Sequence, residues 1–288
     1  MLLKSNEKTC PMKKSLFVVI AVVMVFITFA GCSQEETKSI TVFCGSASKP
    51  AMEEAAQVFE EETGITAYLN SSGSGTVLSQ MKVSQSGDLY IPGSPDYMAM
   101  AIEDGVVEPD TVVIISYLVP AILVKAGNPL NIWGLADLAR PGVEVGIGNP
   151  EAVCVGLYAV EILEYNGLLE QVKPNIVTHA ESCSKTAALV ALKSVDAIIG
   201  WRVFSEWHDT IDVVYLESEQ IPRLSYIPGA ISTYAEDKES AREFLDFLIS
   251  PRGQVIFKKH GYLATEEEAR EYAPYAEIGG AYRLPDDY

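Results

Sequence analysis

The sequence predicts an α/β protein, and two observations support this fold class. β-rich runs alternate with segments of helical spacing, and one strand–turn–helix unit occurs four times along the chain. Such alternation is typical of parallel sheets whose strands are joined by crossover helices. The chain has 288 residues, which allows one large domain or two lobes of ordinary size, and its hydrophobic fraction of 48% is enough for real cores.

The first unit shows the plan most clearly. A β-rich strand at 40–44 leads through a turn of small residues, 45–48, into a helix that begins at Pro50 and ends at Gly64. Proline is favoured in the first helical turn and glycine just after the last one. The sequence therefore predicts both ends of this helix.

The other three units follow the same plan. The second has a strand at 65–69, a Ser/Gly-rich turn at 70–76 and a helix that ends before Gly87, and a further strand follows at 88–91. Glycine and asparagine again mark the ends of the helices. The third and fourth units have predicted strands at 143–147, 176–177 and 197–200 and predicted helices at 157–163 and from 185 to about 195.

Two adjacent turns, 45–48 and 71–76, are dense in hydroxyl groups and glycine. In a parallel sheet the turns and the helix N-termini lie along one edge, where free backbone N–H groups bind anions. None of the four turns contains arginine or a phosphate-loop lysine pattern. Neutral donors are therefore expected to recognise the ligand, although ordinary N-capping would explain any single turn.

The N-terminus predicts export. Two lysines precede fifteen mostly apolar residues and then Gly31-Cys32, which indicates a signal peptide over 1–31. Small residues before Cys32 resemble a bacterial lipobox, which implies that Cys32 is lipidated and that 32–39 tether the domain to the outer face of the cell membrane. An uncleaved anchor helix is the alternative, and it would hold the domain on the same face.

The charge excludes a nucleic-acid partner. Lys and Arg number 21 against 39 Asp and Glu, a formal charge of −18 that repels phosphates and anionic membrane surfaces. The membrane is thus contacted through the lipid anchor only. Cys44, Cys154 and Cys183 form an odd set without framework spacing, so buried free thiols are favoured over a Cys154–Cys183 disulfide.

Several segments carry a resemblance to a known family. They are 40–52, 73–76 with 88–91, and 149–158, of which the last is the most specific, while 241–262 is similar to the closing helix pair of solute-binding proteins generally. In these segments the chain resembles the molybdate-binding and tungstate-binding proteins of ABC importers, a branch of the periplasmic-type solute-binding proteins.

The resemblance implies a two-lobe, type II solute-binding fold. Each lobe would be a mainly parallel sheet flanked by helices, with two crossing strands as a hinge. Lobe 1 is expected to comprise 40–117 plus 227–288 and lobe 2 to comprise 118–226. The same resemblance implies a monomer that captures molybdate or tungstate and delivers it to an ABC permease, without catalysis and without a cofactor.

The ligand contacts also follow from the resemblance. The family's first-turn serine falls on Ser46 or, in another branch, on Ala47, and Ser46 is chemically the better match. The second-turn serine falls on Ser74, and the backbone N–H donors fall on Val155 and Cys183. The metal would thus be bound as an oxyanion, with Ser46 and Ser74 as hydroxyl donors.

Arg202 stands near a tyrosine position of the family. The stretch after Gly200 reads Trp-Arg-Val-Phe, so the family's hydroxyl is missing there. One interpretation is that the Arg202 guanidinium points its donors at the oxyanion. The other is that Arg202 is a surface residue paired with Glu206, and the sequence leaves both open.

Protonation favours a fully ionised oxyanion. Molybdate, tungstate and sulfate need only donors, whereas hydrogen phosphate carries a proton that a carboxylate accepts best. Glu181 in the fourth turn is the one such carboxylate, and it keeps phosphate as an alternative. Sulfate, which needs only donors, is another alternative. A serine acylase is a further one, because Ser46 and Lys49 fit an S-x-x-K pattern, but its companion motifs are missing.

Overall fold

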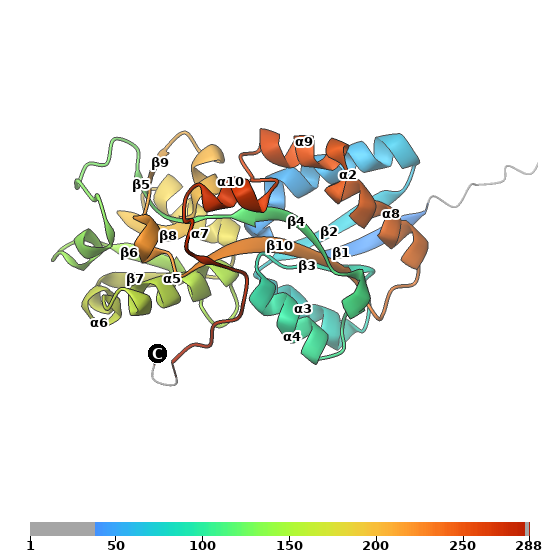
Figure 1. The fold of residues 1–288 in the computed structure, drawn as a ribbon, viewed down its shortest axis with the longest axis horizontal. Helices are drawn as coiled ribbons and strands as arrows, with labels where there is room; N and C mark the ends of the chain where they lie inside the picture. The colour runs from blue at the N-terminus through green and yellow to red at the C-terminus, as the bar shows by residue number, and fades with distance from the viewer. Residues whose placement is uncertain (1–37, 286–287) are drawn as a thin grey trace, which may run out of the picture. The chain divides into compact units, whose positions relative to one another are not determined.

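The computed structural model describes residues 38–285 and 288, and these residues fold into two α/β lobes (Figure 1). The predicted signal peptide, Cys32 and nearly all of the predicted tether lie outside the described residues. In the part that is described, no helix is both long and apolar enough to cross a bilayer.

Lobe 1 is built on a sheet of order β11-β10-β3-β1-β2, with β4 paired to β10. β1 is parallel to β2 and β3, whereas β10 is antiparallel to β3 and β4. The strands are β1 (Ser39–Gly45), β2 (Thr66–Ser72), β3 (Leu89–Ile91), β4 (Val113–Leu118), β10 (Arg223–Ile231) and β11 (Glu277–Ile278). The helices are η1 (Ser46–Ser48), α2 (Lys49–Thr63), α3 (Ser74–Ser84), α4 (Pro95–Glu103), η2 (Pro109–Thr111), α8 (Lys238–Ile249), α9 (Pro251–Lys259) and α10 (Glu266–Arg270).

Lobe 2 has a sheet of order β7-β6-β8-β5-β9. β6 is parallel to β7 and β8, and β5 is antiparallel to β8 and β9. The strands are β5 (Pro120–Lys125), β6 (Val145–Gly148), β7 (Ile176–Ala180), β8 (Ala197–Trp201) and β9 (Ile211–Val214). The helices are η3 (Leu135–Ala139), α5 (Cys154–Tyr165), α6 (Leu169–Val172), η4 (Lys173–Asn175), α7 (Cys183–Ala191), η5 (Arg202–Glu206) and η6 (Ser218–Gln220).

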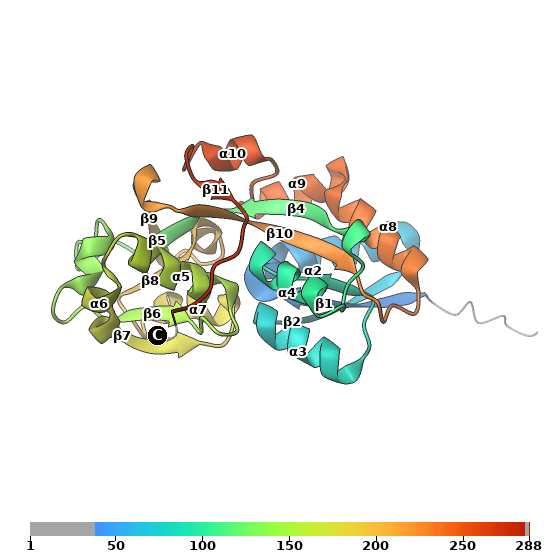
Figure 2. The same ribbon diagram turned by 60° about the horizontal axis from the view of Figure 1, so that its bottom comes forward.

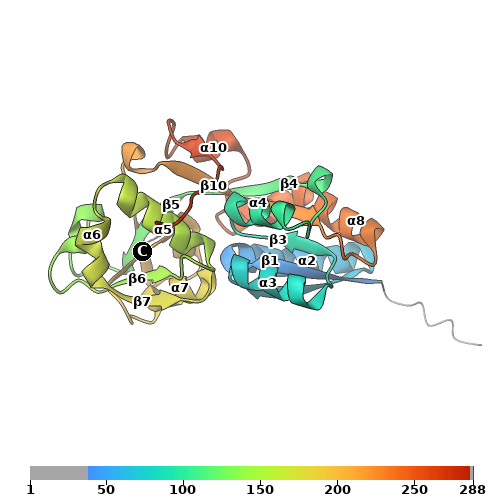
Figure 3. The same cartoon turned by 90° about the horizontal axis from the view of Figure 1, so that it is seen from below.

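The four predicted strand–turn–helix units are confirmed. In the first of them, Pro50 occupies the first turn of α2, and Gly64 ends the helix with a left-handed φ of 75°. Such a conformation is cheap for glycine alone. Within each lobe the parallel strands run in one direction. The turns after β1 and β2 in lobe 1, and those after β6 and β7 in lobe 2, therefore open at the side where the lobes face each other (Figure 3).

Two details differ from the prediction. The sheets are mixed rather than mainly parallel, because β5 is antiparallel to β8 and β9, and β10 is antiparallel to β3 and β4. The helix of the fourth unit, α7, ends at Ala191 rather than near Val195, since Lys193 adopts a left-handed φ of 61° that a helix cannot contain.

Two strands carry the chain between the lobes. β4 continues through Val119 into β5, and β10 returns from lobe 2 paired antiparallel with β4, with Ser225 opposite Leu118 and Gly229 opposite Val113. Figure 2 shows both strands running across one side of the molecule. The predicted lobe limits at 117/118 and 226/227 fall within this paired segment.

Buried apolar residues form two clusters. One fills lobe 2 between its sheet and α5, and it continues to Leu224 of β10 and Ala269 of α10. The other fills lobe 1 and continues into lobe 2 through Val155, Cys183 and Trp201. The lobes are therefore packed against each other at the ends of α5 and α7.

Candidate functional site

The N-terminal ends of four helical segments meet where the two lobes touch. Ser46 begins η1 and Ser74 begins α3 in lobe 1, while Val155 is the second residue of α5 and Cys183 the first of α7 in lobe 2. Each of the four is at most 3% exposed. These residues, here called the interlobe cluster, are the ones that the resemblance singles out, apart from Arg202.

Hydrogen bonds join the lobes at this cluster. The Ser184 N–H donates to Ser46 Oγ over 3.1 Å, and the Gly75 N–H donates to the Ala152 carbonyl oxygen over 3.0 Å. Ser184 directly follows Cys183, and Ala152 lies just before α5. The structure thus brings all four members of the cluster together.

Both serine hydroxyls of the cluster are held by backbone donors. Ser46 Oγ accepts from Ser184, and Ser74 Oγ accepts from the Gly93 N–H over 3.0 Å. The Tyr90 hydroxyl donates to the Ser74 carbonyl oxygen over 3.0 Å and so fixes the backbone there. A hydroxyl has one proton and two lone pairs, so an oxygen that accepts from N–H keeps its proton for another acceptor. Each serine can therefore donate one O–H hydrogen bond to an anion.

Lobe 2 adds the positive ends of two helices. The first N–H groups of an α-helix have no partner within the helix and carry its partial positive charge. In α7, the Ser182 hydroxyl accepts from the Lys185 N–H over 3.2 Å, and the Ser184 N–H donates to Ser46 Oγ. The Val155 N–H hydrogen-bonds the Cys183 thiol, a weak acceptor that an anion would replace. The Cys183 N–H is the other donor that a bound anion would meet, as helix N-termini do in many anion sites.

Charged side chains of the turns lie outside the cluster. The Lys49 ammonium is 3.7 Å from a Glu53 carboxylate oxygen, and both side chains are about half exposed. Glu181 is largely exposed and pairs with Lys185, whose hydrogen bond lowers the pKa of the Glu181 carboxyl. Glu151 is exposed as well. The interlobe cluster therefore offers an anion only neutral hydrogen-bond donors.

This geometry also bears on the serine-acylase alternative. Such an enzyme needs a base in contact with its nucleophile. Lys49 turns instead towards Glu53 and lines a separate cavity of about 200 Å³ with Cys44 and Ser71. Ser46 and Lys49 are therefore not arranged as a nucleophile and its base.

Arg202 is not brought to the cluster. Its Nη2 donates to the Gly261 carbonyl oxygen, and its guanidinium lies 5.4 Å from the centre of the Tyr272 ring. Trp201, the last residue of β8, is fully buried, and neighbouring residues at a strand end point to opposite sides. The Arg202 side chain is thereby directed at the C-terminal segment and away from the proposed ligand.

A fifth strand–turn–helix unit, absent from the sequence-based prediction, reaches the cluster through Gly93. A Cβ at this position would lie 2.7 Å from both Ala47 Cβ and Cys154 Sγ, closer than real Cβ contacts allow. Glycine is thus required for the turn to approach both lobes. The signal was present in the sequence, where a strand ending at Ile91 is followed by small residues and by Pro95, which lies in the first turn of α4.

The three cysteines of the described part are free and buried, as favoured from the sequence. Cys154 Sγ and Cys183 Sγ lie 3.4 Å apart. Burial raises the pKa of the Cys44 thiol to about 12, and burial together with the adjacent Cys154 raises the pKa of Cys183 well above its ordinary value. Cys44 and Cys183 are therefore neutral thiols at physiological pH.

We expect the free energy of unfolding to fall as the pH rises above about 9, the ordinary pKa of the thiol. Between there and about 12 the unfolded chain releases the Cys44 proton while the folded protein retains it, so alkali favours unfolding. Each such group contributes a slope of at most about 1.4 kcal/mol per pH unit. Urea denaturation at a series of pH values checks this, and Cys44→Ala should reduce the slope. A flat profile through pH ~10 would contradict the assignment.

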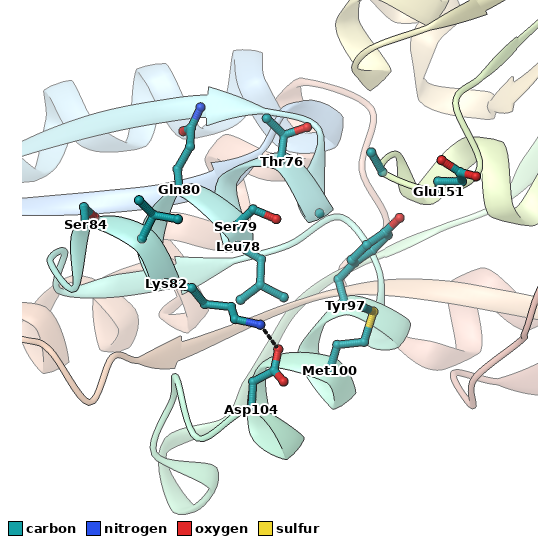
Figure 4. A pocket seen from close by; sticks show the side chains of 13 residues that line it. Thr76, Leu78, Ser79, Gln80, Lys82, Ser84, Tyr97, Met100, Asp104 and Glu151 are labelled. Carbon is teal, nitrogen blue, oxygen red and sulfur yellow. Dashed lines mark hydrogen bonds and ion pairs between the residues drawn. The ribbon is translucent and has the colours of Figure 1, made fainter.

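A groove of about 770 Å³ borders the cluster along α3 and α4 (Figure 4). Leu78 and Met100 give it an apolar floor, and Lys82 is neutralised by Asp104 at 2.7 Å. Glu151 of lobe 2 stands at its edge. The groove therefore suits a small dianion less well than the converging donors of the cluster.

Known proteins resemble the chain over most of its length. It is 24% identical over 238 residues to the molybdate-binding protein ModA of Escherichia coli (strain K12), covering 81% of this chain and 92% of that protein. The periplasmic molybdate-binding protein of Azotobacter vinelandii has a similar structure, with a TM-score of 0.69 at 18% identity over 79% of this chain and 100% of that one. The sulfate-binding protein SubI of Mycobacterium tuberculosis H37Rv has a TM-score of 0.70 at 17% identity over 84% of this chain and 94% of that one.

These structures share the two-lobe fold with the present chain, which confirms the predicted fold class. The family comparison adds a match over residues 40–263, a segment that contains lobe 2, most of lobe 1, both crossing strands and every member of the interlobe cluster. The chain belongs to the family of bacterial extracellular solute-binding proteins.

Proposed function

We propose that this protein captures a fully ionised tetrahedral oxyanion, molybdate or tungstate, between its lobes and delivers it to an ABC permease. The observation that carries the proposal is the state of the two buried serines. The oxygens of Ser46 and Ser74 already accept backbone N–H groups, so their protons are free to point at an anion. A relative named as molybdate-binding, at 24% identity, supports the same ligand.

In the proposed mechanism the two lobes supply complementary donors. Ser46 and Ser74 donate O–H groups from lobe 1, and Val155 and Cys183 donate N–H groups from lobe 2. Because neither lobe alone presents all four donors, the anion binds best when the lobes are together. Ligand binding thus favours the closed arrangement, which the permease would recognise.

The position of Glu181 argues against hydrogen phosphate. That ligand would need an acceptor for its proton, and Glu181 was the candidate from the sequence. It is largely exposed and held by Lys185, away from the cluster. An oxyanion without a proton, such as molybdate, tungstate or sulfate, therefore fits the donors better.

Isothermal titration of residues 33–288, which contain the whole compact unit 38–288, tests the proposal. Molybdate and tungstate are expected to bind tightly, and phosphate weakly or not at all. A preference for sulfate would keep the mechanism and change the ligand. Failure of all four anions to bind would refute the proposed function.

The same titration repeated at rising NaCl concentration examines the role of neutral donors. The protein carries a formal charge of −18, but solvated carboxylates are screened over about 8 Å at physiological ionic strength. Donors of the cluster act at contact distance and escape this screening. We therefore expect little change of affinity with salt, and a steep dependence would point to a cation in the site.

We further propose that the domain acts as a monomer held at the outer face of the membrane through lipid on Cys32. The lipobox resemblance at Gly31-Cys32 supports this anchor. A tethered binding protein stays close to its permease, which raises the effective concentration of loaded protein there.

A further inference from the structure

A buried arginine connects the two lobes away from the interlobe cluster. Arg223, the first residue of β10, is 4% exposed. Its Nη2 lies 2.6 Å from Glu161 Oε2 in α5 of lobe 2 and 3.2 Å from Asp96 Oδ1 in α4 of lobe 1. Its Nε donates to Glu161 Oε1 over 2.7 Å, and its guanidinium lies 4.5 Å from the centre of the Tyr158 ring. One side chain thus binds carboxylates of both lobes.

The C-terminal segment makes a second connection at the same place. Gly279 and Gly280 both have left-handed φ values, which turn the chain out of β11, and the Gly279 carbonyl oxygen accepts from Arg223 Nη1 over 3.1 Å. The Tyr282 N–H then donates to Asp96 Oδ1 over 2.9 Å, and the Tyr282 hydroxyl donates to Glu164 in α5. Figure 2 shows this dark red segment passing from β11 across α5.

Asp96, Glu161, Arg223 and Tyr282, here called the clasp, differ from the cluster in both chemistry and place. Two buried carboxylates share one cation, and Asp96 Oδ2 is buried without a hydrogen-bond partner among the described residues. A buried charge is tolerated only when it is paired. Asp96 can therefore remain against lobe 2 only while Arg223 and the Tyr282 N–H bind it.

The clasp is not explained by the family resemblance. The family match ends at residue 263, whereas Tyr282 lies in the segment beyond it. Side chains of this segment, including Tyr282 and Leu284, pack against the apolar cluster of lobe 2. The segment therefore starts beside the crossing strand β10, bonds to lobe 1 and rests on lobe 2.

We propose that the clasp sets the ligand affinity of this protein by holding the lobes closed, with Asp96, Arg223 and Tyr282 as positioning residues that do not touch the ligand. The proposal rests on the proposed function in one respect, that the ligand binds between the lobes. A ligand selective for the closed arrangement gains apparent affinity in proportion to the fraction of protein already closed. Contacts that exist only in the closed arrangement raise this fraction.

The first test needs no ligand. Nitroxide labels on Val83→Cys in α3, 87% exposed in the parent chain, and Leu192→Cys after α7, 77% exposed, report the distance between the lobes. Residues 33–288, the form used for titration, contain only Cys44, Cys154 and Cys183 as native cysteines, and all three are buried, so labelling of that form is selective. Pulsed electron spin resonance should give a longer distance distribution when the chain ends at Gly280 than when it is complete.

The second test measures molybdate affinity. Tyr282→Phe removes the bond to Glu164 and should weaken binding about fivefold, the typical value of one hydrogen bond. Ending the chain at Gly280 also removes the N–H donor to Asp96 and should weaken binding at least tenfold, with faster dissociation. Tyr275→Phe is the matched control, because Tyr275 is 85% exposed and its hydroxyl can be removed without loss of affinity.

The two tests separate this inference from the proposed function. If the complete chain binds none of the four anions, the proposed function fails, and the distance measurement still decides whether the clasp holds the lobes together. The shortened chain and Tyr282→Phe both leave Arg223 and its buried ion pairs in place, so neither test depends on replacing this arginine. Unchanged distance distributions in the shortened, folded chain would overturn the proposal that the clasp holds the lobes closed.

Discussion

Replacing Ser46 and Ser74 together with alanine is expected to abolish oxyanion binding while the protein stays folded. Each hydroxyl is proposed to give one hydrogen bond to a charged acceptor, worth about 1.5–3 kcal/mol. Loss of both should lower affinity by at least about a hundredfold. The Ser46 change also removes the acceptor of the Ser184 N–H in the closed arrangement. Titration with molybdate measures the effect, and thermal unfolding confirms the fold.

The matched control uses serines of the same lobe that lie on the surface. Ser79 in α3 and Ser86 beyond it are both exposed, so Ser79→Ala with Ser86→Ala removes two hydroxyls without touching the cluster. This variant should bind as the unchanged protein does. Equal affinity of the Ser46/Ser74 variant and the control would remove the cluster from consideration as the ligand site.

Gly93→Ala is expected to give the second large effect. The change keeps the N–H donor to Ser74 and adds only a methyl group, so the effect comes from that group alone. That methyl carbon would lie 2.7 Å from Ala47 Cβ in lobe 1 and from Cys154 Sγ in lobe 2. Forcing an extra methyl group into a packed site typically costs about 1–3 kcal/mol. Molybdate affinity should fall roughly tenfold or more, with the fraction of closed protein falling in parallel.

A rescue variant makes the Gly93 test specific. Ala47→Gly and Cys154→Ala remove the two atoms that the new methyl group would meet, so their combination with Gly93→Ala should recover much of the lost affinity. Gly134→Ala is the control, since a Cβ at Gly134 meets nothing within 4 Å and its φ of −169° suits any residue. Full affinity of Gly93→Ala by itself would show that the close approach is not needed for binding.

Much of the fold was predictable because its signals are local. Strand and helix periods, Pro50 at a helix start and Gly64 at a helix end all act within a few residues. The positions of Ser46 and Ser74 followed from the same units, since turns after parallel strands share one edge. Gly93 was predictable by the same reasoning, as its turn also joins a strand to a helix that begins with proline.

The orientation of Arg202 could not be read from its neighbours in the sequence. Whether it meets a ligand, Glu206 or a backbone carbonyl depends on which distant segment packs beside η5, and Gly261 lies 59 positions further along the chain. The contacts of the clasp could not be read from the sequence for the same reason. Arg223 and Glu161 are 62 positions apart, and Asp96 and Tyr282 are 186 apart.

By itself, the sequence determined the strand–turn–helix units, the serine-bearing turns and the acidic charge, since each depends on composition or on residues close along the chain. Only the tertiary structure decided which hydroxyl oxygens are already occupied by N–H donors, where Arg202 points and how the C-terminal segment joins the lobes. The physical reason is that a hydrogen bond or a buried ion pair requires two groups to meet at about 3 Å, and for groups far apart in sequence that meeting is set by the packing of whole lobes.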